Sequence, residues 1–567
     1  MGDSGREWHR LSGWRRPLAA ALMTALGFAA WLAVEVIPAT PSRRSPDPAA
    51  EATASGDRGA GGRVVIGVRA DVSSFNIYTA TNAFTQEVID LLYLRLADEQ
   101  DDFRSGPPTF RPSLAASWEQ SPDHRALTFH LRPEVRWGSG SAVTAADILF
   151  SHRAATHPDV AWVGADVKDA ITAVEAPDAR TVVFRFERDS PYELMDAVEG
   201  NVIPAAAFAA IPFPEWPKHA FLEAPSPDGP FLLKRYEPGA LIELVRNPDY
   251  HRAPLPAPAS VVFRVLPDES TLINELLSGG IDVMENVPPH AAARLESSSR
   301  LRIARAPDLS YGFVCWNTSR PLFSDPKVRR ALTLAIDRDA ILEGLLPGVG
   351  RPSAGPILSF LWAADPELKP LPYDPGEARR LLRESGWEDR NGDGLLDRDG
   401  ATFRFDLEAN QGSGLRADIA QMIAAQLRRV GIEAIPRILE FGAFVARHER
   451  HEFDAFVSSY RESTRIDLRS AFHSAAREGG YNYGLYSDAE LDTLIDRARR
   501  ESDTAVATDL WRRAQRIIAR DQPYTFLFER DRLHAFPRSL EGVRPSPRTA
   551  YAGLEEWRWK GATASAP

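Results

Sequence analysis

Oxygen-bearing side chains alternate with other residues in one short stretch of the chain, a pattern that could bind calcium. Asp389, Asn391 and Asp393 take the first, third and fifth positions of a calcium-binding loop, and Gly394 takes the sixth. The twelfth position of such a loop is a bidentate Glu, whereas this chain has Gly400 there. We therefore favour a tight polar turn over a weak surface calcium site.

Two histidines three positions apart, His448 and His451, are the other candidate metal ligands. Two imidazoles on one helix face can share a metal, but the zinc-protease spacing fails because position 452 is Glu, and we favour a solvated helix face. The sequence contains no nucleophile elbow, no phosphate-binding loop and no convincing catalytic triad. The single cysteine, Cys315, lies in the apolar run YGFVCW and is predicted to be a buried thiol. We therefore predict no enzyme activity, no metal site and no cofactor.

Length and composition indicate a large, acidic, globular protein. The 567 residues exceed what one hydrophobic core accommodates, so two or three domains are expected. The formal net charge of -11 argues against nucleic-acid binding, which needs a basic surface. One cysteine permits no intrachain disulfide, yet it does not exclude export, because a large core needs no covalent crosslink.

The N-terminus carries the pattern of an export signal over residues 1–39. Arg15 and Arg16 precede an apolar run at 17–37, as a basic region precedes the hydrophobic region of a signal peptide. The run of about 20 residues can also span a bilayer, so an uncleaved membrane anchor is the alternative. Either way, the positive charges before the run place the rest of the chain outside the cytoplasm. Residues 40–63 are rich in Pro, Ala, Gly and Ser and are predicted to be a flexible linker.

Two consecutive short helices are predicted over 321–346. Asp325 and Asp337 each precede residues with helical spacing and are predicted to be N-caps. The apolar stripe of the first helix excludes Arg329 and consists of Val328, Ala331, Leu332 and Ala335.

Strands and helices alternate through the body of the chain, which is predicted to begin at Val64. Strands are predicted at 64–70, 126–132, 261–266, 311–317, 402–409, 432–439, 453–458 and 524–528, and helices at 85–96, 145–155, 270–278, 415–430, 487–500 and 505–519. This alternation predicts an α/β sheet.

Five separated segments carry a resemblance to a known family. They are RPSLAASWEQSPDHRALTFHLRPEVRWGSGSAVTAADILFS (111–151), NPDYHR (247–252) with FRVLPDESTLINELLSGGIDVMENVPP (263–289), the helices of 321–346 with GVGRPSAGPI (348–357), LRRVGIEAIPRILEFGAFVARHERHEFDAF (427–456), and FHS (472–474) with GGYNYGLYSDAELDTLIDRAR (479–499). In this order they resemble the solute-binding proteins of peptide and nickel ABC importers, the family 5 extracellular binding proteins. The resemblance covers the body from Val64 to about Trp559.

The resemblance implies an α/β fold of the type II periplasmic-binding-protein kind, with two lobes (three subdomains) and a ligand cleft between them. Lobe I is expected at 64–308, with an inserted subdomain at about 98–226, and lobe II at 309–523. Residues 524–567 are expected to return to lobe I and to form the C-terminal tail. Closure of the lobes about a hinge would bury the ligand and present a surface to a membrane permease.

The chain departs from the peptide-binding members of the family at 458–468, which reads SSYRESTRIDL. Those members commonly carry an acidic stretch here, whose carboxylate holds the amino terminus of the ligand. This chain has Arg461 and Arg465 in the stretch, together with Glu462 and Asp467, and neither carboxylate is assigned to the position that holds the amine. The two arginines suggest an anionic ligand group, with solvated surface charges as the alternative.

Further candidate ligand contacts lie at the ends of predicted strands, which face the ligand crevice in α/β sheets. Each is weighed against an ordinary structural role, such as a core aromatic or a turn residue. They are Tyr78, Asn82 and Phe84 after the opening strand, Trp316 and Asn317 at the end of the strand at 311–317, Trp362 in a loop, Asn410 after the strand at 402–409, and Tyr460 after the strand at 453–458.

The resemblance implies a periplasmic receptor that binds a peptide-like solute and delivers it to an ABC transporter permease in the inner membrane. A monomer that binds no nucleic acid is expected. The alternative ligand is a chelate of nickel or another metal. Two alternative classes are a ligand sensor tethered to the membrane by residues 17–37 and a secreted hydrolase.

Overall fold

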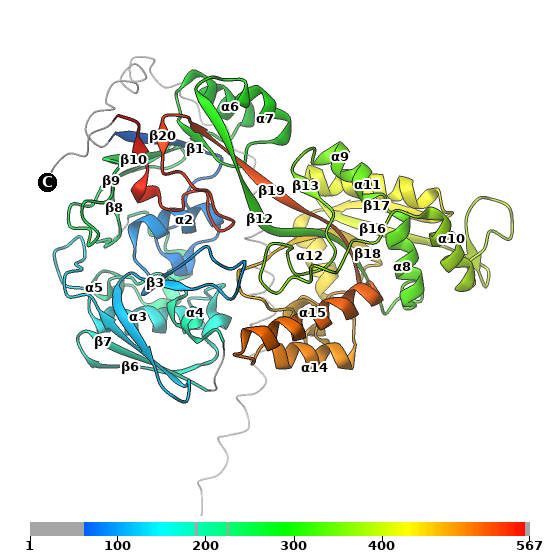
Figure 1. Cartoon of the computed structure of the whole chain (residues 1–567), viewed down its shortest axis with the longest axis horizontal. Helices are drawn as coiled ribbons and strands as arrows, with labels where there is room; N and C mark the ends of the chain where they lie inside the picture. Colours follow the sequence, from blue (N-terminus) through cyan, green and yellow to red (C-terminus); the bar gives the residue numbers. More distant parts are fainter. Residues whose placement is uncertain (1–61, 188–190, 224–225, 562–567) are drawn as a thin grey trace, which may run out of the picture.

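A computed structural model describes residues 62–187, 191–223 and 226–561 (Figure 1). The predicted signal or anchor and most of the predicted linker lie outside these residues. Across these three ranges, no helix is both long and apolar enough to span a membrane.

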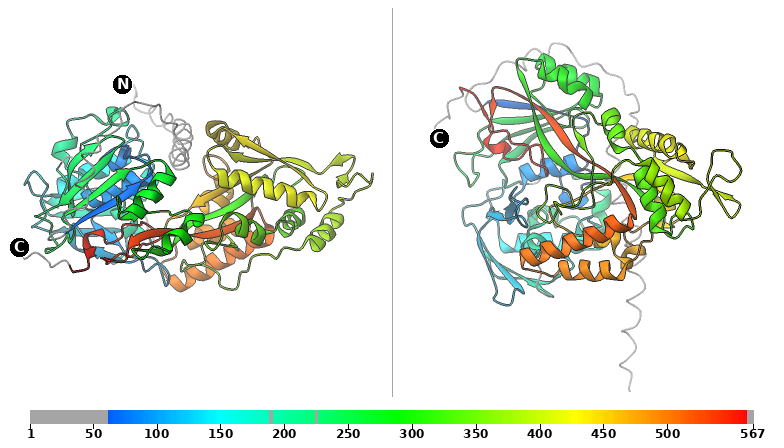
Figure 2. Two further views of the ribbon diagram at one scale, coloured as in Figure 1. Left: turned by 90° about the horizontal axis from the view of Figure 1, so that it is seen from above. Right: turned by 45° about the vertical axis from the view of Figure 1, so that its right-hand side comes forward.

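Two lobes are joined by the paired strands β12 (Leu301–Trp316) and β19 (Tyr524–Pro537), which run diagonally between them (Figures 1 and 2). These antiparallel strands lie inside one 11-stranded sheet with the order β17-β16-β18-β12-β19-β11-β1-β10-β9-β8, to which β13 adds by pairing with β19. The sheet therefore passes through both lobes.

Lobe I contains the elements before β12 and those after β19. Its main elements are β1 (Arg63–Val68), α2 (Ala83–Leu92), β2 (Ala97–Glu99), β3 (Phe110–Pro112), β8 (Phe231–Glu237), β9 (Leu241–Arg246), β10 (Ser260–Val265), α6 (Glu269–Ser278), β11 (Val283–Met284), α7 (Pro289–Glu296), β20 (Leu540–Glu541) and β21 (Arg558–Trp559). Strand β1 pairs in parallel with both β10 and β11. A separate four-stranded antiparallel sheet forms the inserted subdomain, which contains β4 (Ala115–Gln120), β5 (Ala126–Leu131), α3 (Ala145–Thr156), β6 (Ile171–Asp178), β7 (Thr181–Phe186), α4 (Glu193–Val198) and α5 (Ala205–Phe208).

Lobe II contains the elements between β12 and β19. They are α8 (Pro326–Ala335), α9 (Arg338–Leu345), β13 (Gly350–Arg351), α10 (Pro375–Glu384), β14 (Asp397–Arg398), β15 (Ala401–Thr402), β16 (Arg404–Asn410), α11 (Gly414–Arg428), β17 (Glu433–Leu439), α12 (Phe441–Glu449), β18 (Ala455–Arg461), α13 (Arg469–Phe472), α14 (Ala489–Ala498) and α15 (Thr504–Asp521). Strand β16 pairs in parallel with β17 and β18, as expected when helices connect neighbouring strands.

The two helices predicted over 321–346 are confirmed as α8 and α9. Asp325 caps α8 by accepting a hydrogen bond from the Lys327 amide at 2.8 Å, and Asp337 caps α9 through the Ala340 amide at 3.0 Å. Arg329 corrects the prediction, because it is buried although it lies off the apolar stripe. Its guanidinium donates to the backbone carbonyls of Phe323, Ser324, Asp521 and Gln522, so it joins α8 to the end of α15.

Both joining strands are longer than the sequence predicts. The predicted strands at 311–317 and 524–528 are only the apolar lobe II halves of β12 and β19. The pairing register shifts between Pro307 and Tyr311, where β12 bulges against β19.

Alternation along β12 directs its side chains to two different cores. Val314 and Trp316 enter one apolar cluster of lobe II, whereas Phe313 and Cys315 enter another on the opposite face. Cys315 is buried, as predicted.

Candidate ligand-binding site

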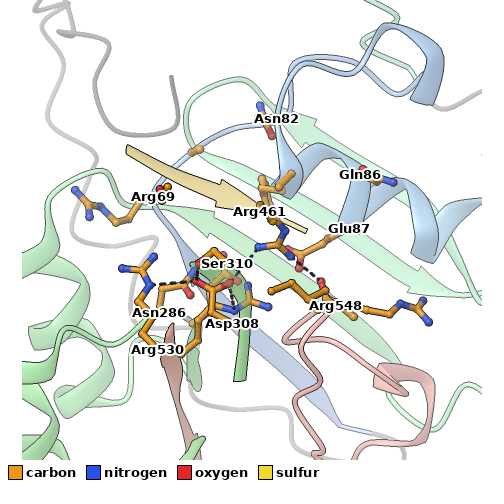
Figure 3. A pocket seen from close by; sticks show the side chains of 18 of the residues that line it. Arg69, Asn82, Gln86, Glu87, Asn286, Asp308, Ser310, Arg461, Arg530 and Arg548 are labelled. Atoms are coloured by element: carbon orange, nitrogen blue, oxygen red, sulfur yellow. Dashed lines mark hydrogen bonds and ion pairs between the residues drawn. The ribbon is translucent and has the colours of Figure 1, made fainter. Parts of the chain in front are cut away.

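A cavity of about 770 Å³ lies between the lobes. Its walls come from β1, α2 and the loop after β11 in lobe I, and from α11 and the end of β18 in lobe II. The middle stretches of β12 and β19 also line it (Figure 3). Sites of this size and position suit a small solute.

Three arginines surround the buried carboxylate of Asp308 at the bulge of β12. Its oxygens lie 3.1 Å from Nε of Arg530, 3.5 Å from Nη1 of Arg461 and 3.7 Å from Nε of Arg532. Burial alone would raise the pKa of Asp308, but Arg532, Arg530 and Arg461 outweigh burial and lower it. Asp308 is therefore ionised, and three guanidinium groups around one carboxylate leave an excess of positive charge.

Two carboxylates of lobe I, Glu87 on α2 and Glu285 after β11, line the same cavity. Burial raises the pKa of Glu87 to about 8, with repulsion from Glu285 as the next cause, against the attraction of Arg532 and Arg461. Burial also raises the pKa of Glu285. The site thus places groups of both charge signs around one cavity.

Three of the predicted contact residues, Asn82, Phe84 and Arg461, line this cavity. The Asn82 side chain also caps α2, because its Oδ1 accepts a hydrogen bond from the Thr85 amide at 2.8 Å. Arg461 donates from Nη2 to the carbonyl of Arg548 at 3.4 Å, which connects β18 to the C-terminal segment of lobe I.

Asn410 lies behind the cavity wall rather than on it. Its Oδ1 accepts a hydrogen bond from Nη1 of Arg416 at 2.8 Å, and Ser459 Oγ accepts another from Nη2 at 2.8 Å. Arg416 does line the cavity. Asn410 therefore orients a cavity-lining cation.

The two predicted tyrosines support the wall from behind. The Tyr78 hydroxyl donates to the Asn201 carbonyl at 2.8 Å, and its ring packs on Trp162, which lines the cavity. The Tyr460 hydroxyl donates to the Tyr481 carbonyl at 3.2 Å, and the structure places Tyr460 in an aromatic cluster of lobe II.

The structure does not bring Trp316, Asn317 and Trp362 to the cavity. Trp316 is buried in a lobe II core, because the side chains of Val314 and Trp316 at the end of β12 point to that face of the sheet. Its Nε1 donates a hydrogen bond to Oγ1 of Thr525 at 3.0 Å. Asn317 is buried in a turn and donates to the Phe453 carbonyl at 2.9 Å. Trp362 packs in the lobe II core on the other face of the sheet.

Arg465 also lies away from the cavity, in a set of contacts that we call the interlobe latch. Nη1 of Arg465 lies 2.6 Å from Oδ1 of the buried Asp196, and its guanidinium lies 4.5 Å from the centre of the Tyr192 ring. The Thr464 hydroxyl donates to Oε1 of Glu99 at 2.6 Å, and the Tyr192 hydroxyl donates to the carbonyl of Ile466 at 3.3 Å. The latch thus joins residues 464–466 of lobe II to lobe I, and the ion pair with Asp196 neutralises the charge of Arg465.

Among the charged residues that line the cavity, sequence reasoning identified only Arg461. The residues it missed include Glu87, Glu285, Asp308, Arg416 and Arg530. A usable signal existed for Glu285, which follows the short strand β11.

The two candidate metal sites resolve differently. In the turn at 389–394, Asp389 accepts hydrogen bonds from the amides of Gly392 and Gly394, as a tight polar turn requires. The predicted solvated face for His448 is wrong, because His448 is buried, stacks on Phe456 and has its Nε2 3.2 Å from Oε2 of Glu408. Within the described residues, no group of three or more His, Cys, Asp or Glu is arranged to hold a metal ion.

Two lobes that share one sheet and enclose a charged cavity define the class of two-lobed solute-binding proteins. Comparison with known proteins specifies the family. A family model described as "Bacterial extracellular solute-binding proteins, family 5 Middle" matches residues 109–474. The chain belongs to family 5 of the bacterial extracellular solute-binding proteins, as the sequence resemblance indicated.

Individual relatives agree with this assignment. The chain is 30% identical over 503 residues to the oligopeptide-binding protein AppA of Bacillus subtilis (strain 168), covering 88% of this chain and 91% of AppA. The solved structure of Bacillus subtilis AppA in complex with a nonapeptide matches with a TM-score of 0.73 at 29% identity, over 88% of this chain and 99% of that chain. NikZ from Campylobacter jejuni, solved in complex with Ni(L-His), shares the fold with a TM-score of 0.73 at 22% identity, over 88% and 99% of the two chains.

Proposed function

We propose that this chain binds a peptide-like solute in the cavity between its lobes and delivers it to an ABC transporter permease in the membrane. The observation that carries the proposal is the cavity of about 770 Å³, to which both lobes contribute charged side chains. A solute that touches both walls favours the closed arrangement, which is how such receptors signal occupancy. The relatives named as oligopeptide-binding proteins support a peptide as the ligand.

A periplasmic location fits this role, because the family is extracellular and the sequence begins with a basic region followed by an apolar run. The receptor would act as a monomer with one solute per cavity. An uncleaved run at 17–37 would instead leave the receptor tethered to the membrane.

The alternative solute is a metal chelate, whose organic acid groups would contact cavity arginines such as Arg416 and Arg530. Mass spectrometry of small molecules that co-purify with the exported full chain distinguishes the two. Peptides in the denatured extract support the proposal. A nickel chelate in their place, or no peptide retained from a mixed peptide pool, would refute it.

A further inference from the structure

Most carboxylates that line the interlobe cavity are already in salt bridges. Asp90 and Glu199 pair with Arg95, Glu99 with Arg548, Glu269 with Arg69, Asp308 with Arg530, and Asp531 with Arg351. Glu87 and Glu285 differ, because neither forms a salt bridge with any other described residue. Glu87 accepts a hydrogen bond from the side chain of Thr549.

The nearby arginines lie against another carboxylate rather than against either glutamate. Arg532 and Arg461 attract both glutamates, but both arginines lie against Asp308. Arg532 also donates to the Pro547 carbonyl at 2.8 Å. Two like-charged carboxylates in one partly buried wall repel each other unless a cation or a proton lies near them.

The hydroxyl of Tyr551 provides an independent indication at the same place. Tyr551 is buried, and within the residues that the structure describes its hydroxyl has no hydrogen-bond partner. Glu285 and Glu87 are the charged groups that act most strongly on this hydroxyl. Tyr551 does not line the cavity itself, but its buried hydroxyl without a partner is an unfavourable feature close to the two carboxylates.

The opposite wall offers no acidic group for a ligand cation. Among the described residues of 317–523, the charged side chains that line the cavity are Arg416 and Arg461, and none is a carboxylate. A cationic group of the solute must therefore be held from the lobe I side.

Resting on the proposed function, we propose that Glu87 and Glu285 form a subsite for a primary ammonium group of the solute. The ammonium comes either from the amino terminus of a peptide or from a lysine side chain, and both present the same three N–H donors. Hydrogen bonds between an ammonium and two carboxylates are charge-assisted and stronger than neutral ones.

Binding should release a proton. The pKa of Glu87 is raised to about 8, so at pH 6.5 the pair holds a proton in the free protein. The arriving ammonium keeps all its own protons, and the carboxyl proton passes to the buffer. Glu285, Arg532, Arg461 and Tyr551 are the titratable or charged groups near Glu87. The Tyr551 hydroxyl keeps its proton at this pH, because burial raises its pKa above the ordinary value.

The test uses the purified full chain and two random tetrapeptide libraries, one with free amino termini and one N-acetylated. We expect the free library to be retained. Lysine-containing members alone should be retained from the acetylated library if the ammonium is a side chain, and none if it is the amino terminus. Equal retention of acetylated, lysine-free peptides would overturn the subsite while leaving the proposed function intact. Retention of neither library would overturn the proposed function itself.

Variants and calorimetry give a second measure. Glu87→Gln and Glu285→Gln should each weaken a retained peptide about tenfold or more, since each removes a charge-assisted contact. The exposed Glu296→Gln in α7 is the control and should bind normally. Titrations at pH 6.5 in two buffers of different ionisation enthalpy should show release of up to about one proton by the wild type and less by Glu87→Gln, in which only Glu285 can release one. Equal proton release by both proteins would contradict the subsite.

Discussion

Replacing Arg465 by Ala should weaken solute binding about 30-fold, because it breaks the interlobe latch on one side. The Arg465 side chain is 22% exposed and its partner Asp196 only 2%, with 2.6 Å between Nη1 and Oδ1. The pair joins lobe II to the inserted subdomain, so its loss acts on the arrangement of the lobes rather than on the fold of either.

The magnitude follows from the burial of the two partners. Exposed ion pairs contribute about 0.2–1 kcal/mol, whereas removing one partner of a buried pair costs about 3–5 kcal/mol. Arg465 is mostly but not fully shielded from solvent, so we place the loss between these ranges, at about 2 kcal/mol, or about 30-fold in affinity. Burial raises the pKa of Asp196 although the attraction of Arg465 lowers it. Without Arg465, Asp196 can therefore take up a proton, which limits the loss of affinity.

The assay is calorimetric titration of a retained peptide into wild type, Arg465→Ala, Asp196→Asn and the double variant. The double variant should lose less than the sum of the single losses, since both single changes remove the same contact. Arg469→Ala is the matched control, because Arg469 pairs at 2.8 Å with the exposed Asp496 within lobe II. Wild-type affinity in Arg465→Ala, or strictly additive losses, would refute the reasoning.

Three further changes test other parts of the structure. Asn410→Ala should lower affinity about 2- to 10-fold at unchanged melting temperature, because Arg416 loses one of its two positioning hydrogen bonds; a titration with the same peptide checks this. Arg329→Met should lower the free energy of unfolding in urea by about 3 kcal/mol and leave affinity unchanged, since it orphans buried carbonyls at the end of α15. Burial lowers the pKa of His534 to about 3 from 6.5, so the unfolded chain binds the proton first as pH falls, and stability present above pH 6.5 is lost below it. His534→Leu should reduce that loss by up to about 1.4 kcal/mol per pH unit, and an unchanged slope in urea titrations between pH 6.5 and 4 would contradict it.

Helices with local signals could be predicted well from the sequence. In α8 and α9 the cap and the apolar stripe lie within a few residues of each other, and α8 also has Pro326 in its first turn. A capping box at Thr144, with Asp147 as the reciprocal partner, likewise starts α3 with a signal local in the sequence.

The joining strands could be predicted only in part, for a physical reason. The run at 529–532 alternates charges without an apolar face, so it carries no strand signal of its own. It forms a strand because β12 pairs with it from more than 200 positions away, as the Pro307 to Asp531 register shows. The charged cavity residues Arg530, Asp531 and Arg532 were therefore not predicted from the sequence.

The candidate contacts show the same limit at the level of single residues. The strand-end argument led to Asn410, which lies behind the cavity wall, and to Trp316, which the alternation of side chains along β12 places in a core. Glu87 lies on a helix, where a lone carboxylate is indistinguishable in sequence from a solvated one. Only the tertiary fold brings it into the same wall as Glu285.

The bulge of β12 has a mechanical consequence. A rotation of one lobe against the other moves atoms in proportion to their distance from the axis, and a break in a strand ladder is where a two-stranded ribbon bends most easily. Asp308 and Arg530 lie at that break, whereas Glu87 and Arg416 lie on the walls to either side. We therefore expect Asp308 and Arg530 to move little when the lobes close, whereas Glu87 and Arg416 on the cavity walls move further. A solute group bound at Asp308 and Arg530 would make the same contacts in the open and closed forms. Binding of the solute and closure of the lobes would then be successive steps.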